Sequence, residues 1–258
     1  MPKFNANLTL MFNEVDFLDR FAAARAAGFK GVEFLFPYDF EAGELAARLQ
    51  DNDLVQVLHN LPPGDWDAGE RGTAILPDRK EEFRVGIDKA IEYATRLGTP
   101  QLNCLAGIAP PNADPAQLKD TFVENLAYAA EKLKAEGIKL LIEAINTRDI
   151  PGFYLNHTKQ AADIIAETGS DNLFIQYDVY HMQIMEGDLA PTIETWLDQI
   201  PHIQISDTPG RHEPGTGEIN YPFLFDHIDR LGYRGWIGCE YRPAGRTEEG
   251  LGWLKPYL

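Results

Sequence analysis

Apolar and polar positions along this chain of 258 residues follow two different periods in turn. Short runs rich in β-branched and other apolar residues are each followed by a longer stretch in which apolar residues recur every three or four positions. The short runs are typical of buried strands, and the longer stretches are typical of amphipathic helices. The pattern predicts strands over Phe4–Leu8, Gly31–Phe36, Leu54–His59, Gln101–Ala106, Lys139–Ala144, Leu173–Val179, His202–Asp207 and Trp236–Tyr241. It predicts helices over Val15–Ala27, Glu41–Asp51, Arg79–Leu97, Pro115–Glu136, Thr158–Thr168, Leu189–Gln199, Tyr221–Leu231 and Glu248–Leu254.

Glycine marks the end of four of these helices. In AAGFKGVEF, RLGTPQLN, AEGIKLLIE and RLGYRGWIG a glycine stands just after the last apolar position of the helical pattern. A glycine at that place adopts the left-handed conformation that ends a helix and turns the chain into the next strand.

The order of the elements predicts the fold. Strands and helices alternate, with no linker or low-complexity stretch between them, which favours an α/β protein with a single (β/α)8 TIM barrel domain over residues 1–258. The alternative is an open, doubly wound parallel sheet. That fold usually has a glycine-rich turn after its first strand, and the segment FNANLTLMF has none.

Polar residues stand at the ends of four consecutive predicted strands. They are Glu143 in KLLIEAIN, Asp178 in LFIQYDVYH, Gln204 in HIQISD and Glu240 in WIGCEY. Side chains alternate along a strand, and the chemistry of a TIM barrel lies at the carboxyl ends of its strands. If the aliphatic residues of these strands face the outer helices, the four polar side chains converge inside the barrel.

This convergence predicts a metal site. A lone glutamate at a strand end is more often a salt-bridge partner or a solvated loop residue. Three carboxylates close together would repel one another and lose hydration, and a divalent cation removes that conflict. Three carboxylates and an amide oxygen form a hard ligand set that suits Mg²⁺ or Mn²⁺, whereas zinc would be expected to recruit more imidazole or thiolate.

The overall charge bears on partners and location. Acidic residues number 40 and basic residues 23, giving a net charge of −17. That balance argues against a nucleic-acid or anionic-membrane surface and favours a small substrate. Two cysteines suggest a reducing compartment, and the first residues show no signal or membrane segment, so a cytoplasmic protein is expected. Assembly into a homo-oligomer is left open.

Motifs along the whole chain carry a resemblance. HIQISD and PGTGEINYPFLFDHIDRLGYRGWIGCEY resemble the closing strands of the xylose-isomerase-like barrel superfamily. NANLTLMF, GFKGVEFLFPYD, LHNLPPGDWDAGERG, YDVYHMQIMEGDL and EPGTGEINY stand where the hydroxypyruvate isomerase family has them. The resemblance implies conversion of hydroxypyruvate to 2-hydroxy-3-oxopropanoate (tartronate semialdehyde). A sister group that acts on 2-oxo-tetronates shares these motifs and is not separated by them.

The resemblance also implies roles for the strand-end residues. Glu143 and Glu240 would be the catalytic pair, one acting as base and the other as acid. Asp178 and Gln204 would complete the metal set with them. Many superfamily members have histidine where this chain has Gln204, and the hydroxypyruvate isomerases share the glutamine.

An anionic 2-keto-acid substrate would need a cation near the metal. Arg71 follows the third strand in LPPGDWDAGERGTAILPD, and the alternative for it is a surface arginine paired with Asp67 or Glu70. Arg211 and His212 follow the seventh strand in DTPGRHEPGTGE, where glycines suit a lid or a close backbone approach.

Two histidines are further substrate-binding candidates. His181 lies three residues beyond the aspartate of the sixth strand and is predicted to contact a substrate oxygen or a metal-bound water. His59 ends the third strand. For both, the alternative is a histidine with a purely structural role.

Three other functions remain to be weighed. A ketose 3-epimerase would use the same metal and glutamates, but its neutral substrate would not need the arginines. An abasic-DNA endonuclease would need more zinc ligands and a basic groove, which six histidines and a net charge of −17 do not favour. A non-catalytic binding barrel would leave both glutamates unexplained. Motifs of serine hydrolases, P-loop proteins, HExxH metalloproteases and dinucleotide-binding folds are absent from the sequence.

Overall fold

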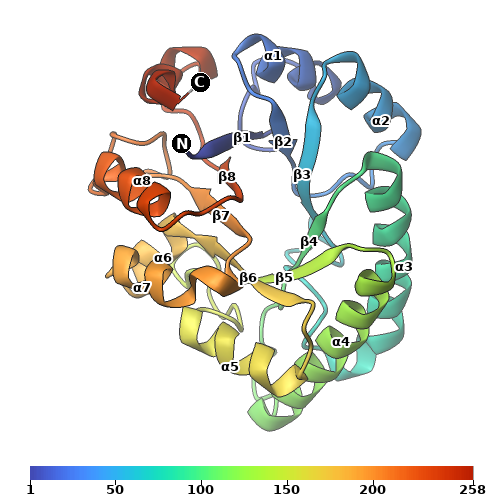
Figure 1. Cartoon of the computed structure of the whole chain (residues 1–258). Helices are drawn as coiled ribbons and strands as arrows, with labels where there is room; N and C mark the ends of the chain where they lie inside the picture. The colour runs from blue at the N-terminus through green and yellow to red at the C-terminus, as the bar shows by residue number, and fades with distance from the viewer. Residues whose placement is uncertain (258) are drawn as a thin grey trace.

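Eight parallel strands close into a barrel in the computed structural model, which describes residues 1–257 (Figure 1). Each strand pairs with the next one along the chain, and the last pairs with the first, so the predicted TIM barrel is confirmed. The strands are β1 (Lys3–Asn7), β2 (Gly31–Glu33), β3 (Val55–Asn60), β4 (Gln101–Cys104), β5 (Lys139–Glu143), β6 (Leu173–Asp178), β7 (His202–Ile205) and β8 (Trp236–Cys239).

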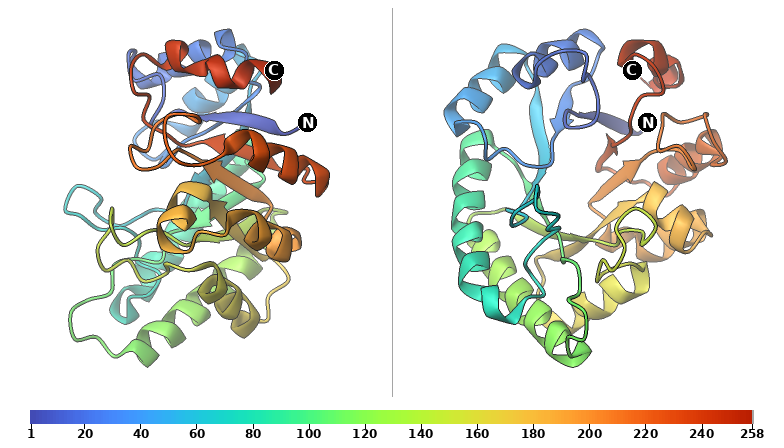
Figure 2. Two further views of the ribbon diagram at one scale, coloured as in Figure 1. Left: turned by 90° about the vertical axis from the view of Figure 1, so that its left-hand side faces the viewer. Right: turned by 180° about the vertical axis from the view of Figure 1, so that it is seen from behind.

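Helices surround the barrel, and the loops that follow the strands gather at one end of it (Figures 1 and 2). None of the helices in residues 1–257 has both the length and the apolar character needed to cross a membrane. The α-helices are α1 (Arg20–Ala26), α2 (Ala42–Asp51), α3 (Lys80–Leu97), α4 (Pro115–Ala135), α5 (Thr158–Thr168), α6 (Val179–Met185), α7 (Leu189–Trp196) and α8 (Tyr221–Arg230). Shorter or tighter 3₁₀ helices are η1 (Phe17–Asp19), η2 (Pro77–Arg79), η3 (Leu197–Gln199) and η4 (Thr247–Tyr257).

The glycines that end helices behave as the sequence predicts. Gly98 follows α3 directly with φ 69°, and its amide closes the last turn onto the carbonyl of Ala94. A left-handed residue costs glycine little because it has no Cβ. The other three predicted helix-ending glycines also have positive φ.

Two apolar regions stabilise the barrel. The larger one fills the space between the strands and the helices and includes Val32, Ile142 and Phe122, all fully buried. The smaller one lies among residues of the barrel itself and includes Leu141, against which Phe174 packs. On β5 and β6 these two residues precede polar side chains of the same face, so the interior becomes polar toward the carboxyl ends of the strands.

The structure corrects the prediction after the sixth strand. The sequence predicts a strand continuing to Val179, whereas β6 ends at Asp178 and a short helix, α6, begins at once. Asp178 makes this change of direction because its Oδ1 accepts hydrogen bonds from the backbone amides of Tyr180 at 2.7 Å and His181 at 3.1 Å. An N-cap of this kind satisfies amides that the first helical turn leaves without partners.

Candidate active site

A cavity of about 560 Å³ opens at the carboxyl ends of the strands. Its wall combines acids from the barrel with basic and aromatic side chains from the loops. Among the residues that line it are Glu143, Glu240, His181, Arg71, Arg211, Arg242, Trp66 and Tyr180. Both predicted glutamates of the catalytic pair therefore face the same space.

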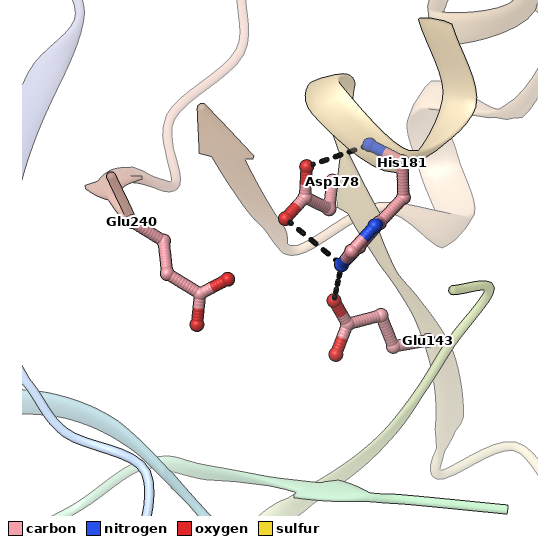
Figure 3. Close-up of side chains that lie close together, drawn as sticks. All are labelled: Glu143, Asp178, His181 and Glu240. Carbon is pink, nitrogen blue, oxygen red and sulfur yellow. Dashed lines mark hydrogen bonds and ion pairs between the residues drawn. The ribbon is translucent and has the colours of Figure 1, made fainter. Parts of the chain in front are cut away.

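Four buried side chains form a cluster (Figure 3), and all of them except Asp178 line this cavity. Glu143 ends β5, Asp178 ends β6, His181 lies in the first turn of α6 and Glu240 follows β8 directly. One ligand atom from each lies within 4.8 Å of the ligand atoms of the others. The three predicted carboxylates thus come together although they are far apart in the chain.

The two carboxylate oxygens of Asp178 have different surroundings. Oδ1 caps α6, as described above. Oδ2 is buried and makes no hydrogen bond within residues 1–257, and Nε2 of His181 is 3.7 Å away. A buried carboxylate oxygen without a donor is costly, and it indicates that a ligand belongs there.

Two side-chain amides hold the carboxylate of Glu143 in place. Its Oε2 accepts hydrogen bonds from Nδ2 of Asn103 at 2.8 Å and Nε2 of Gln176 at 2.9 Å. Burial raises the pKa of Glu143 well above its ordinary value, and the nearby carboxylates of Glu240 and Asp178 raise it further.

Glu240 has a cation beside it. Its Oε2 accepts from Nη2 of Arg211 at 2.8 Å, and its Oε1 accepts from Nδ2 of Asn7 at 3.2 Å. Burial nevertheless raises the pKa of Glu240 to about 8, because its effect is larger than that of Arg211, which lowers this pKa. Two neighbouring carboxyls with raised pKa can keep a proton between them at neutral pH, as acid–base catalysis requires.

The donor set fits a divalent cation. Three buried carboxylates share a small volume, two of them resist ionisation there, and the third has an oxygen without a donor. Oxygen ligands of this kind suit Mg²⁺ or Mn²⁺ better than zinc. Glu143, Asp178 and Glu240 could therefore hold a metal ion.

Gln204, the fourth predicted ligand, is buried and lies opposite Asp178 in the register of β6 and β7. Its Nε2 donates to Oε1 of Glu33 at 2.8 Å, and its Oε1 accepts from Nε2 of Gln176 at 2.6 Å. An amide oxygen has two lone pairs, so one remains for an ion. Gln204 thereby joins the carboxylate cluster to a polar layer beneath it.

Glu33 is the centre of that layer, and sequence analysis missed it. It is fully buried and accepts hydrogen bonds from Asn5 at 2.8 Å, Asn7 at 3.1 Å, His202 at 2.8 Å and Gln204 at 2.8 Å. Burial alone would raise the pKa of Glu33, but His202 and the amides lower it overall. The only signal in the sequence was one acidic residue inside an apolar predicted strand.

Arg71 lies at the cavity wall, stacked on an aromatic ring. Its guanidinium carbon is 3.8 Å from the centre of the Trp66 ring, and its Nη1 donates to the carbonyls of Trp66 at 3.0 Å and Glu70 at 2.6 Å. The carboxylate of Glu70 pairs with Arg79 instead. Within residues 1–257, Arg71 therefore forms neither of the alternative surface pairs, with Asp67 or with Glu70.

The loop after β7 separates its two predicted residues. Arg211 adopts a left-handed backbone with φ 55° and inserts between Glu240 at 2.8 Å and Asp149 at 3.9 Å. His212 turns away and its Nδ1 bonds to the carbonyl of Arg242 at 2.7 Å. Arg211 lines the cavity, whereas His212 is not among the lining residues.

The two histidine candidates also occupy different places. His181 lines the cavity, and burial lowers its pKa to about 4. His59 is fully buried, with its ring edge-on to Tyr38, and it is not among the lining residues. Its neighbour Asn60 lines the cavity, because alternate residues of β3 point to opposite sides.

Known proteins resemble this chain over its full length. A family model described as xylose isomerase-like TIM barrel matches residues 21–257. A 2-oxo-tetronate isomerase of Cupriavidus necator is 55% identical, over all of this chain and 99% of that protein. A hydroxypyruvate isomerase of Escherichia coli is 54% identical over all of both chains. A crystal structure described as AP endonuclease, family 2, from Brucella melitensis is 49% identical, with a TM-score of 0.98 over all of this chain and 99% of that one.

Proposed function

The chain belongs to the hydroxypyruvate isomerase family of xylose isomerase-like TIM barrels, and we propose that it interconverts hydroxypyruvate and 2-hydroxy-3-oxopropanoate. A 2-oxo-tetronate, which has one more carbon, is the alternative substrate within the same family. The observation that carries the proposal is the pair of buried glutamates, Glu143 and Glu240, facing one cavity with raised pKa values.

The proposed reaction moves one proton between neighbouring carbons. One glutamate removes the C3 proton of hydroxypyruvate, and the electron pair forms a C2–C3 double bond while the C2 carbonyl oxygen becomes an enediolate oxygen. The other glutamate delivers a proton to C2, the proton of the C3 hydroxyl passes to the C2 oxygen, and C3 becomes the aldehyde. Glu143 comes from β5 and Glu240 from the end of β8, so the two carboxyl groups reach the cavity from different strands. This arrangement suits proton removal at C3 by one glutamate and proton delivery to C2 by the other.

We assign Glu143, Asp178, Glu240 and Gln204 to a divalent ion, Mg²⁺ or Mn²⁺. When bound, it would supply Lewis-acid stabilisation of negative charge on the substrate oxygens. Asp178 suits the role of fixed ligand, because the α6 cap already immobilises its carboxylate. Nε2 of His181 lies 3.8 Å from Oε1 of Glu143 and 3.7 Å from Oδ2 of Asp178, so it can donate a hydrogen bond to a substrate oxygen that lies beside the ion.

The substrate carboxylate is assigned to the arginines at the cavity wall. Arg211 is already paired with Glu240, so Arg71 is the first candidate and Arg211 the second. Both hydrogen bonds that Arg71 makes within residues 1–257 use Nη1, which leaves its Nε and Nη2 for a carboxylate. His212 and His59 stand lower as candidates, because neither is among the residues that line the cavity.

Glu143→Gln and Glu240→Gln test the pair. Each variant is expected to lower turnover of hydroxypyruvate or 2-oxo-tetronate by at least ~10²-fold, because general acid–base catalysis supplies about that much. Turnover is measured with Mg²⁺ or Mn²⁺ added, and circular dichroism checks folding. Glu131→Gln, at an exposed position of α4, is the matched control and should keep full activity.

Near-normal activity in either active-site variant would remove that residue from the catalytic pair. Deuterium from D₂O should also appear at C2 of the product, provided that the proton on the glutamates exchanges with water. Complete carry-over of the original hydrogen in every turnover, together with full activity of a variant, would instead indicate a hydride shift.

A nuclease function, after which the Brucella melitensis protein is named, has less support in this chain. Within residues 1–257 one group of histidine, cysteine and acidic side chains is close enough to hold an ion, and it has four members. The net charge of −17 also disfavours binding of DNA, because it repels the phosphate backbone. A neutral-sugar epimerase remains the nearer alternative, and substitution of the cavity arginines distinguishes it, because a neutral substrate would not need them.

A further inference from the structure

Asn146 lies beside His181, behind the carboxylate cluster. It is fully buried in the loop that follows β5, and its Nδ2 is 2.6 Å from Nδ1 of His181. Nothing in the proposed chemistry above uses Asn146. Its contact is nevertheless with the ring nitrogen opposite the one that faces Glu143 and Asp178.

Asp149 fixes which way the Asn146 amide points. The backbone N–H of Asp149 donates to Oδ1 of Asn146 at 2.8 Å, while Nδ2 of Asn146 donates to Oδ2 of Asp149 at 3.2 Å. Rotating the amide by half a turn would bring two donors together and two acceptors together. Asp149 is itself held by the hydroxyl of Tyr180, which donates to Oδ2 at 2.9 Å. The NH₂ group of Asn146 therefore faces the imidazole.

A neutral imidazole has one nitrogen that donates and one that accepts. Because the NH₂ group of Asn146 can only donate, Nδ1 of His181 accepts and the ring proton lies on Nε2. Nε2 is 3.8 Å from Oε1 of Glu143 and 3.7 Å from Oδ2 of Asp178 (Figure 3), and both His181 and Glu143 line the cavity.

We propose that Asn146 is a positioning residue that holds His181 in the tautomer protonated on Nε2. The Nε2–H then donates to the substrate oxygen on which negative charge develops. A nitrogen that carries a proton has no lone pair for a metal, so His181 serves the substrate and leaves the ion to the carboxylates. The tautomer follows from this chain's own contacts, whereas its role in turnover rests on the proposed function.

The tautomer is measured directly in the wild-type chain without substrate. Long-range ¹H–¹⁵N spectra of protein with ¹⁵N-labelled histidine distinguish protonated from unprotonated ring nitrogens, and His181→Asn identifies the His181 signals. We expect an unprotonated Nδ1 and a protonated Nε2. A protonated Nδ1 with an unprotonated Nε2 would overturn the proposal.

Asn146→Asp tests the positioning role. A carboxylate accepts and does not donate, so it should draw a proton onto Nδ1 of His181. We expect the unprotonated Nδ1 signal to disappear and kcat to fall by ~10–10²-fold, with a smaller change in KM, because the lost donation matters most in the transition state. If this variant does not fold, Asn146→Ala removes the donor and should mix both tautomers. Retention of the wild-type tautomer and kcat in the folded variant would overturn the assignment.

Asn156→Asp is the matched control. Asn156 also contacts a histidine, with its Oδ1 2.6 Å from Nδ1 of His157, but neither residue lines the cavity. The His181 spectrum and kcat should remain unchanged, and an equal loss of kcat there would refute a specific role for Asn146. If the wild type shows the expected tautomer but turns over neither 2-oxo acid, the proposed function fails while the tautomer assignment stands.

Discussion

Arg71 shows how one side chain can be prepared for a ligand. The guanidinium stacks on Trp66, and Nη1 is fixed by two backbone carbonyls. Less side-chain freedom remains to be lost when an anion binds, and the planar fork matches a carboxylate in two hydrogen bonds. Such an arrangement is of little use to an enzyme whose substrates are neutral sugars.

Arg71→Ala is therefore expected to lower kcat/KM for a 2-oxo acid by ~10²–10³-fold, on the order of 3–4 kcal/mol, because a desolvated charge pair loses one partner. Arg71→Lys should recover only part of this loss. Arg84, which lies over the ring of Tyr128 at 5.1 Å outside the cavity, provides the control, and Arg84→Ala should have no effect. Unchanged kinetics in both the Arg71 and the Arg211 alanine variants would favour the neutral-sugar epimerase.

Single residues also mark where sequence analysis was limited. The three acidic strand ends were predictable because their strands contain regularly placed aliphatic residues. The orientation of His59 was not predictable, because its neighbours Val57 and Leu58 both pack in the inner cluster with Leu141, and strict alternation in β3 therefore does not hold. The register between β2 and β3 also shifts after Val32, which moves the inner face. The contact of Asn146 with His181 and the contacts of Glu33 join residues far apart in the chain, so no local pattern could indicate them.

At the scale of elements, strand and helix boundaries depend on contacts that a local pattern does not contain. Val179 continues the apolar character of β6, so the sequence predicts that the strand extends to it. The cap by Asp178 instead begins α6 and brings His181 back over the barrel. The same aspartate thus accounts both for the wrong strand boundary and for the place of His181, a predicted site residue, in the cavity wall.

The packing of β3 against its covering helix gives a prediction about pH. His59 is fully buried on β3 close to Ala90 of α3, and burial lowers its pKa from 6.5 to about 3. The unfolded chain therefore binds more protons between these values, so stability is lost as pH falls from 6.5 toward 3. At pH 5 the loss from this residue is about 2 kcal/mol relative to neutral pH.

His59→Gln should reduce this acid sensitivity, because glutamine stays neutral in both states. Urea unfolding of wild type and variant at pH 7.5 and pH 5 measures the difference, and any packing cost of the substitution is common to both pH values. His157→Gln replaces an exposed histidine and is the control for a surface substitution of the same type. Equal acid sensitivity of wild type and His59→Gln would contradict the assignment.

At the scale of the whole molecule, the candidate metal site joins distant parts of the chain. Its carboxylates come from β5, β6 and the residue after β8, so the site exists only when the barrel is closed. The chain already carries a net charge of −17, and the three clustered carboxylates add local repulsion. A divalent ion would offset that repulsion and favour the folded state over the unfolded one.

Metal binding should therefore raise the melting temperature of the whole protein. At a free Mg²⁺ or Mn²⁺ concentration 100 times Kd, linkage stabilises the fold by about 2.7 kcal/mol, which corresponds to roughly 5–10 °C for a chain of this size. Scanning calorimetry of chelator-treated protein with and without added ion measures the shift. Asp178→Asn is the most informative variant, because asparagine can still cap α6 but loses the negative charge. This variant should fold without metal, and added ion should change its melting temperature little or not at all. A full shift in the variant would place the ion elsewhere. No shift in the wild type would exclude the ion.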